Sequence, residues 1–167
     1  MTVIFQITGY KNSGKTTVIE QLTSFGSNTG DIIAVIKHHP HEAPLNPLSE
    51  NSDSERIFNS GASISTVISP KGAQLHTNGE IKLEQMIKWY ESFSPDLILI
   101  EGYKQKNYPK AVILKEEKDK DLLKLCNIKL VLTWGPVPEC DVPVIKIADL
   151  QNQMPAVYAA VTEEGKR

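Results

Sequence analysis

Nine residues near the N-terminus form a pattern that is suited to holding phosphate. The run Gly9–Thr17 reads Gly-Tyr-Lys-Asn-Ser-Gly-Lys-Thr-Thr and matches G-x-x-x-x-G-K-[ST] at every fixed position. The two glycines let the backbone curl tightly, so that the amides of residues 12–16 point inward toward phosphate oxygens. Lys15 is expected to reach the β- and γ-phosphates, and the Thr16 hydroxyl is expected to ligate Mg²⁺. The run therefore predicts a site for a nucleoside triphosphate with magnesium, and we call it the phosphate loop.

Two acidic residues are candidates for the carboxylate that such a site needs beside the metal. Glu101 follows the apolar run Leu97–Ile100, at the end of an expected strand, where open α/β sheets bind their ligands. It is expected to hold Mg²⁺ directly or through water, or to orient an attacking water; a carboxylate at a strand end can also simply face solvent. Asp53 stands at an expected helix N-terminus, where an acid also serves as an ordinary N-cap.

A cluster of histidines follows the second expected strand. The segment reads Lys37-His38-His39-Pro40-His41, and only His76 remains elsewhere as a further histidine. Three interpretations stay open: a loop that faces bound phosphate, with Lys37 as a contact; ordinary surface histidines; or a structural metal site. Against a metal site, no further Cys or His stands at a matched spacing. The positive charge of Lys37 would also repel a metal cation.

Composition narrows the class of protein. The chain has 167 residues without repeats or linkers, which predicts one domain over residues 1–167. Its formal charge of −2 gives no basic footprint for nucleic acid. No apolar run approaches the ~20 residues that cross a bilayer, and no signal peptide is visible, so a cytoplasmic protein is expected. Cys126 and Cys140 are interpreted as two buried free thiols in a reducing compartment.

The elements that must position these residues alternate between strands and helices. Short apolar runs predict strands at residues 3–8, 32–36, 97–100, 111–114, 130–133 and 144–147. Apolar residues at helical spacing predict helices at 15–25, 83–90 and 155–161, and residues 26–30 are expected to form a loop. This alternation is typical of an α/β fold with a mainly parallel central sheet and helices on both faces.

The middle of the chain shows a different pattern. Residues 38–52 lack periodicity, which suggests a functional or mobile loop. Ser52 and Glu55 resemble a capping box that starts a short helix to about Ser60, with Gly61 at its end. Residues 63–68 and 73–77 flank Pro-Lys-Gly and predict a β-hairpin. The charge run 116–121 is expected to form a solvated surface.

Four blocks of residues occur in a characteristic order. They are Ile7–Thr17, Lys37–His41, Asp53–Arg56 followed by Gly61-Ala62, and Leu99–Lys104. Together they resemble the molybdopterin-guanine dinucleotide biosynthesis protein B family, MobB, over residues 3 to about 115. The remainder is similar to that family only in general layout.

The resemblance implies a fold and a function. The fold would be a P-loop NTPase three-layer sandwich, and the nucleotide would be GTP with Mg²⁺, hydrolysed weakly at most by the protein alone. MobB-like proteins are homodimeric adapters that work beside the MobA guanylyltransferase, which joins GMP to molybdopterin. Lys15 and Glu101 would be the catalytic candidates. The resemblance places these residues at the nucleotide or its metal: Gly9, Asn12, Ser13, Gly14, Lys15, Thr16, Thr17, Lys37, His38, Asp53, Arg56 and Glu101.

The chain departs from the family in two respects. Asn51-Ser52 stands where relatives often carry Gly followed by Lys or Arg, so a basic phosphate contact is in doubt. No N-K-x-D sequence is present, so the choice of guanine rests on the resemblance alone.

Trp134 follows a late expected strand and could stack on the base or pack at the sheet edge.

Two other functions use the same loop. A small-molecule kinase would usually need a lid rich in arginine, whereas this chain contains only Arg56 and Arg167. A nickel-type GTPase metallochaperone would need a convincing metal constellation, and the histidine cluster does not supply one. The adapter is therefore the favoured interpretation.

The hairpin is the expected dimer contact. Residues Ser63–Thr77 would form a two-stranded ribbon, which is at best marginally stable alone and offers an open edge to another chain. A symmetric partner would satisfy both needs. Alternatively, the ribbon extends the central sheet of its own subunit.

Overall fold

The computed structural model describes residues 1–39 and 52–164. They fall into two compact units, Met1–His39 with Glu84–Arg167 and Pro40–Leu83, which are described separately. Most of the stretch 38–52 that was expected to be a loop, His41 included, lies outside the described residues. A single domain over residues 1–167 remains a prediction.

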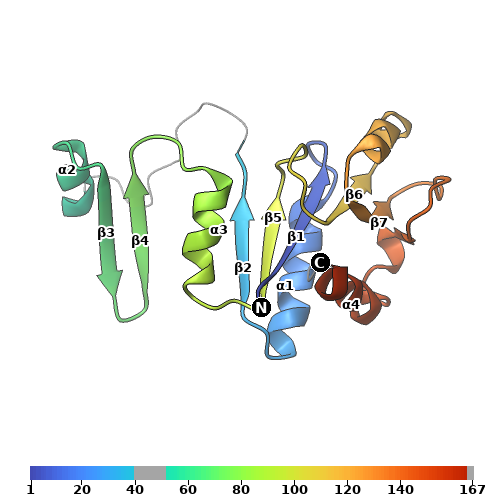
Figure 1. Cartoon of the computed structure of the whole chain (residues 1–167), viewed down its shortest axis with the longest axis horizontal. Helices are drawn as coiled ribbons and strands as arrows, with labels where there is room; N and C mark the ends of the chain where they lie inside the picture. The colour runs from blue at the N-terminus through green and yellow to red at the C-terminus, as the bar shows by residue number, and fades with distance from the viewer. Residues whose placement is uncertain (40–51, 165–167) are drawn as a thin grey trace. The chain divides into compact units, whose positions relative to one another are not determined.

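The first unit is built on a six-stranded sheet (Figure 1). Its strands are β1 (Val3–Gly9), β2 (Ile33–Lys37), β5 (Leu97–Glu101), β6 (Lys110–Leu114), β7 (Ile128–Thr133) and β8 (Val144–Lys146). The order is β2-β5-β1-β6-β7-β8, and every neighbouring pair is parallel. Each predicted strand is confirmed, with its ends shifted by at most two residues.

Helical segments cover both faces of this sheet. They are α1 (Lys15–Asn28), α3 (Leu83–Glu91), α4 (Met154–Glu164) and the 3₁₀ segments η1 (Glu117–Lys124) and η2 (Ile147–Asp149). On one face, Phe5 and Leu99 pack in a core with Leu22 of α1 and Val157 of α4. Neighbouring strand residues point to the opposite face, where Val112 and Val131 pack with Leu122 of η1. Burial on both faces explains why the strands read as continuous apolar runs, and the predicted α/β fold class is confirmed.

Two sequence-based expectations about burial need correction: the charge run 116–121 is exposed except at Asp119, and the two cysteines are not buried. The charge run 116–121 is not wholly solvated, because Asp119 in η1 is buried and its Oδ2 accepts from the backbone N–H groups of Lys115 (2.8 Å) and Glu116 (3.0 Å). A carboxylate that satisfies two backbone donors can be buried where a lone charge cannot. Both cysteines are free, but Cys126 is exposed and Cys140 only half-buried.

The first helix continues past the glycine where it was expected to end. Gly26 is a buried residue inside α1, and the helix ends only at Asn28. A Cβ at Gly26 would lie 2.3 Å from the hydroxyl and 2.7 Å from the ring of Tyr158 in α4. The Tyr158 hydroxyl donates to Asp31 at 2.6 Å, which fixes the ring in place. Gly26 therefore allows two helices to approach closely and does not act as a helix terminator.

Gly26→Ala is expected to destabilise the protein, although alanine is the better helix former by about 0.5–1 kcal/mol. The new methyl group would overlap a Tyr158 ring that has no room to retreat, and overpacking of this kind typically costs about 1–3 kcal/mol. Urea unfolding measures the difference. Ser27→Ala on the exposed side of the same helix is the control. A Gly26→Ala protein more stable than the wild type would show that the helices are not so closely packed.

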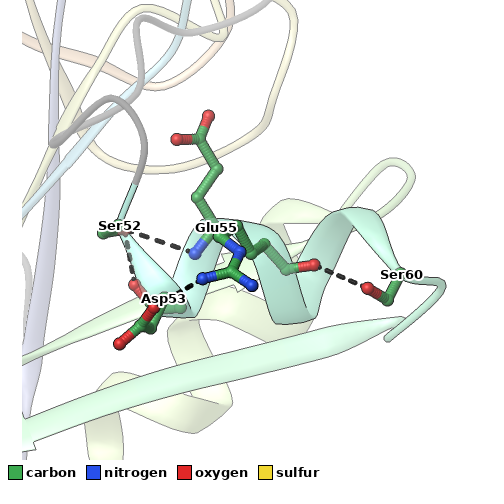
Figure 2. Close-up of polar contacts among 6 residues, drawn as sticks. Ser52, Asp53, Glu55 and Ser60 are labelled. Atoms are coloured by element: carbon green, nitrogen blue, oxygen red, sulfur yellow. Dashed lines mark hydrogen bonds and ion pairs between the residues drawn. The ribbon is translucent and has the colours of Figure 1, made fainter.

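The second unit begins with a short capped helix (Figure 2). In α2 (Asp53–Asn59), Ser52 is the N-cap, and its hydroxyl accepts from the backbone N–H of Glu55 at 3.3 Å. At the other end, the Ser60 hydroxyl donates to the Arg56 carbonyl at 2.8 Å. Gly61 then adopts a left-handed conformation with φ +113°. The predicted start and end of this helix are confirmed.

A separate antiparallel hairpin completes this unit. Strands β3 (Ile64–Ser69) and β4 (Gly72–Thr77) join at Pro70-Lys71, as the sequence predicts. Phe58 of α2 packs edge-on against His76 at 5.8 Å, so α2 lies on the side of the hairpin to which His76 and Val67 both point. The hairpin forms its own two-stranded sheet, so the alternative in which it extends the central sheet is wrong.

Candidate functional site

The phosphate loop adopts the curled backbone that its sequence predicts. It connects β1 to α1, and both Asn12 (φ +60°) and Gly14 (φ +95°) are left-handed. Left-handed residues within such a turn direct successive backbone N–H groups toward one point, which is an anion-binding geometry. Lys15 is the first residue of α1, so the helix N-terminus adds its dipole at the same point.

The Lys15 ammonium lies over its own loop, where it donates to the Tyr10 carbonyl at 2.7 Å. Burial lowers the pKa of Lys15 from its ordinary value; nearby Glu101 raises it, while the like charges of Lys104 and Lys37 lower it further. Positive charge is therefore concentrated around the loop, and an anion bound there would relieve the repulsion among these lysines.

Oxygen ligands suited to magnesium meet at the carboxyl ends of β1, β2 and β5. Glu101 is 7% exposed, and its Oε2 accepts from the Thr16 hydroxyl at 3.3 Å. Lys37 ends β2 opposite Glu101, and its ammonium lies 3.4 Å from Glu101 Oε2 and 3.3 Å from Thr16 Oγ1. A hydroxyl beside a carboxylate is the hard-oxygen donor set that Mg²⁺ prefers. Lys37 is more than half exposed, so its ammonium can swing away to admit a metal ion.

The turn after β5 brings further groups to the phosphate loop. Gly102 (φ +94°) and Tyr103 (φ +49°) are both left-handed, and the buried amide of Gln6 donates to both of their carbonyls. A Cβ at Gly102 would come within 3.1 Å of the His38 Cβ, so glycine is needed for this approach. The ring of His38 stacks on Tyr103 with 4.1 Å between centroids. His38 is thus placed beside the turn as a packing partner.

Lys104 is a candidate that sequence reasoning did not single out. Its ammonium lies 3.6 Å above the Tyr10 ring, at the edge of the phosphate loop, and burial lowers its pKa. The Tyr10 hydroxyl in turn donates to Asp121 at 2.6 Å, so the ring is held in place. Lys104 belongs to the block Leu99–Lys104, one of the four that resemble the MobB family. Its place in that block could have identified it as a candidate from the sequence.

Two side chains hold the outer side of the phosphate loop. Lys115 follows β6 and donates to the Asn12 carbonyl at 3.1 Å. Trp134 follows β7, and its indole N–H donates to the Ser13 carbonyl at 2.8 Å while its ring lies 3.3 Å from where a Cβ on Gly14 would be. Trp134 therefore packs on the phosphate loop, a contact that its place in the sequence did not reveal.

Two predicted site residues lie in the second unit. Asp53, which is labelled in Figure 2, pairs with Arg56 at 3.1 Å within α2. Both side chains are largely exposed. Their roles at a nucleotide remain predictions. Within residues 1–39 and 52–164, no group of three or more His, Cys, Asp or Glu side chains is arranged to hold a metal ion. In the same part of the chain no helix is long and apolar enough to cross a membrane.

Comparison with known proteins identifies close relatives of this chain. Two are described as molybdopterin-guanine dinucleotide biosynthesis adapter proteins, the Bacillus subtilis one as probable and the Methanocaldococcus jannaschii one as putative. The first is 36% identical over 77% of this chain and 75% of its own length. The second is 32% identical over 72% of this chain and 50% of its own length.

Solved structures of MobB proteins are similar to this chain in fold. The crystal structure of Bacillus subtilis MobB superposes with a TM-score of 0.82 at 30% identity and covers 97% of each chain. The MobB homolog from Bacillus stearothermophilus gives a TM-score of 0.78 at 29% identity, over 96% of this chain and 98% of the homolog.

Membership of a family is shown by a family model that matches most of the chain. The model of the family described as molybdopterin guanine dinucleotide synthesis protein B matches residues 4–134, which include the phosphate loop, Lys37, Glu101 and Trp134. The chain therefore belongs to the MobB family.

Proposed function

We propose that this protein is a GTP-binding adapter of molybdenum cofactor biosynthesis that assists the guanylylation of molybdopterin. The main support for a nucleotide site is the contact between the Thr16 hydroxyl and the Glu101 carboxylate beside the curled phosphate loop. The adapter role is supported by membership of the MobB family and by relatives that are described as adapter proteins.

Each residue of the site has a distinct task in this proposal. The backbone N–H groups of residues 12–16 and the ammonium groups of Lys15, Lys37 and Lys104 would bind the triphosphate. Thr16 and Glu101 would hold Mg²⁺, which neutralises phosphate charge when it is bound. Such sites typically gain about 10³–10⁵-fold in hydrolysis from an arginine finger. The first unit has no arginine among its described residues, so we expect weak hydrolysis at most.

The partners follow from the proposed role. An adapter would bring nucleotide or cofactor to a MobA-type guanylyltransferase in the cytoplasm, and molybdopterin or molybdenum cofactor would be the shared substrate. The test is a reconstituted reaction that measures the dinucleotide formed by that enzyme with and without this protein. The reaction itself consumes GTP, so the control is the Lys15→Ala protein: we expect stimulation by the wild type and not by this variant, and an unchanged yield at saturating wild-type adapter would contradict the role.

We also propose that the protein is a homodimer whose contact includes the hairpin. Ile64 and Ile68 lie on the hairpin face opposite α2, together with Leu75, and are 65% and 79% exposed. A two-stranded ribbon with such a face is marginal in water. A second copy would bury the same patch on both chains, as two-fold contacts do.

Ile68→Lys is therefore expected to weaken the dimer. Burying an unpaired ammonium in an apolar contact costs several kcal/mol, so the dimer should dissociate at micromolar concentration. Sedimentation velocity measures the association. Val67→Lys is the matched control, since Val67 lies on the same strand and is 40% exposed, but points to the other face of the hairpin, on the side of α2. A dimer equally disturbed by both changes, or by neither, would place the contact elsewhere.

A further inference from the structure

Two consecutive peptide groups of the phosphate loop are held from outside by side chains at the ends of neighbouring strands. Lys115, which directly follows β6, donates to the Asn12 carbonyl at 3.1 Å. Trp134, which directly follows β7, donates its indole N–H to the Ser13 carbonyl at 2.8 Å. The outer side of the loop is therefore fixed to the central sheet by two hydrogen bonds.

A carbonyl that is held outward aims an N–H inward, because the C=O and N–H of a trans peptide group point in opposite directions. The first of the two peptide groups shows this relation. Its carbonyl, on Asn12, meets Lys115, whereas its N–H, on Ser13, donates to the Tyr10 carbonyl at 3.3 Å. The Lys15 ammonium donates to that same Tyr10 oxygen at 2.7 Å. The inner side of the loop is thus the side on which Lys15 lies.

The second peptide group has the same geometry but leaves its N–H free. Trp134 holds the Ser13 carbonyl outward, so the N–H of Gly14 is aimed at the side of the loop where Lys15 lies. Within the described residues the Gly14 N–H makes no hydrogen bond. It is therefore a donor that is aimed inward and available to an anion, next to an ammonium group.

The indole that sets this direction is itself fixed. The backbone N–H of Trp134 donates to the Leu114 carbonyl at 3.0 Å, and the next N–H, on Gly135, donates to the buried Thr133 hydroxyl at 3.1 Å. The ring lies 3.3 Å from where a Cβ on Gly14 would be. A donor anchored on two strand ends keeps the loop in one conformation before a ligand arrives, which lowers the entropy cost of binding.

We propose that Trp134 is a positioning residue for phosphate binding, because its indole N–H holds the Ser13 carbonyl outward and so aims the Gly14 N–H at a polyphosphate chain. This inference rests on the proposed nucleotide site and deepens it. It gives Trp134 a role toward the phosphates of the ligand and not toward its base, since the indole N–H is used by the phosphate loop itself.

The test is a calorimetric titration of the wild type and of Trp134→Phe with GTP and with inorganic tripolyphosphate, both with Mg²⁺. Phenylalanine keeps an aromatic ring beside Gly14 but has no N–H to donate. We expect the two affinities to fall by the same factor, about three- to tenfold, which is the range that one neutral hydrogen bond contributes. Trp89→Phe is the matched control, because Trp89 is 44% exposed on α3, and it should change neither affinity.

Thermal unfolding of the same samples separates positioning from a purely structural role. Because the Trp134 side chain is 56% exposed, Trp134→Phe should fold. Unchanged affinities for both ligands, whether or not the unfolding temperature falls, would overturn the positioning role. A loss confined to GTP would also overturn it, since Trp134 would then contact the base. A wild-type protein that binds neither ligand would instead refute the proposed nucleotide site itself.

Discussion

Replacing Lys15 with alanine is expected to abolish tight binding of GTP. Lys15 is the lysine of the phosphate loop, and its ammonium lies against the Tyr10 carbonyl, from which it can turn to bound phosphate. Loss of a hydrogen bond to a charged group typically costs about 1.5–3 kcal/mol, or roughly 10- to 150-fold in affinity. The loss should be at least this large, because the loop holds the lysine in place before the nucleotide arrives.

The fold should survive this change. Burial lowers the pKa of Lys15, which means that the folded protein disfavours its charged form. Removal of the charge therefore costs no folding stability at neutral pH. Calorimetric titration with GTP and thermal unfolding measure the two effects on one sample. Lys88→Ala, on the exposed side of α3, removes the same charge as a control. Wild-type affinity in Lys15→Ala would refute the assignment of the phosphate loop.

Glu101→Gln should raise the magnesium concentration required for GTP binding by at least about tenfold. The amide keeps the shape of the side chain but removes the negative charge that would face the metal ion beside Thr16. A tenfold change corresponds to about 1.4 kcal/mol, a modest part of what a direct carboxylate ligand contributes. The measurement is a GTP titration repeated over a range of magnesium concentrations.

Stability should change little in the same variant. The Glu101 carboxylate is buried, so its replacement by a neutral amide removes a desolvation penalty, and the Lys37 ammonium left behind lies on a side chain that is 57% exposed and stays hydrated. Glu163→Gln, at an exposed position of α4, is the control. If the magnesium dependence is the same in both variants, Glu101 is a structural residue at a strand end, and Asp53 becomes the stronger metal candidate.

The sequence by itself determined the strands, the phosphate loop and the acid at the strand end. These features depend on local physics: an apolar run predicts a buried strand, and two glycines beside a lysine and a threonine predict the curled turn. Glu101 was predictable because the carboxyl ends of parallel strands meet at one edge of the sheet. The family blocks added the expectation of GTP and of an adapter, which local patterns do not contain.

Only the tertiary structure decided which distant residues meet. Gly26 reads as a helix end in the sequence, but the approach of Tyr158, 132 positions later, makes it a packing residue inside α1. Asp119 reads as part of a solvated charge run, but two backbone donors allow its burial. Lys115 and Trp134 contact the phosphate loop from more than a hundred positions away. Such contacts depend on strand order and close packing, which a single sequence does not encode in any local pattern.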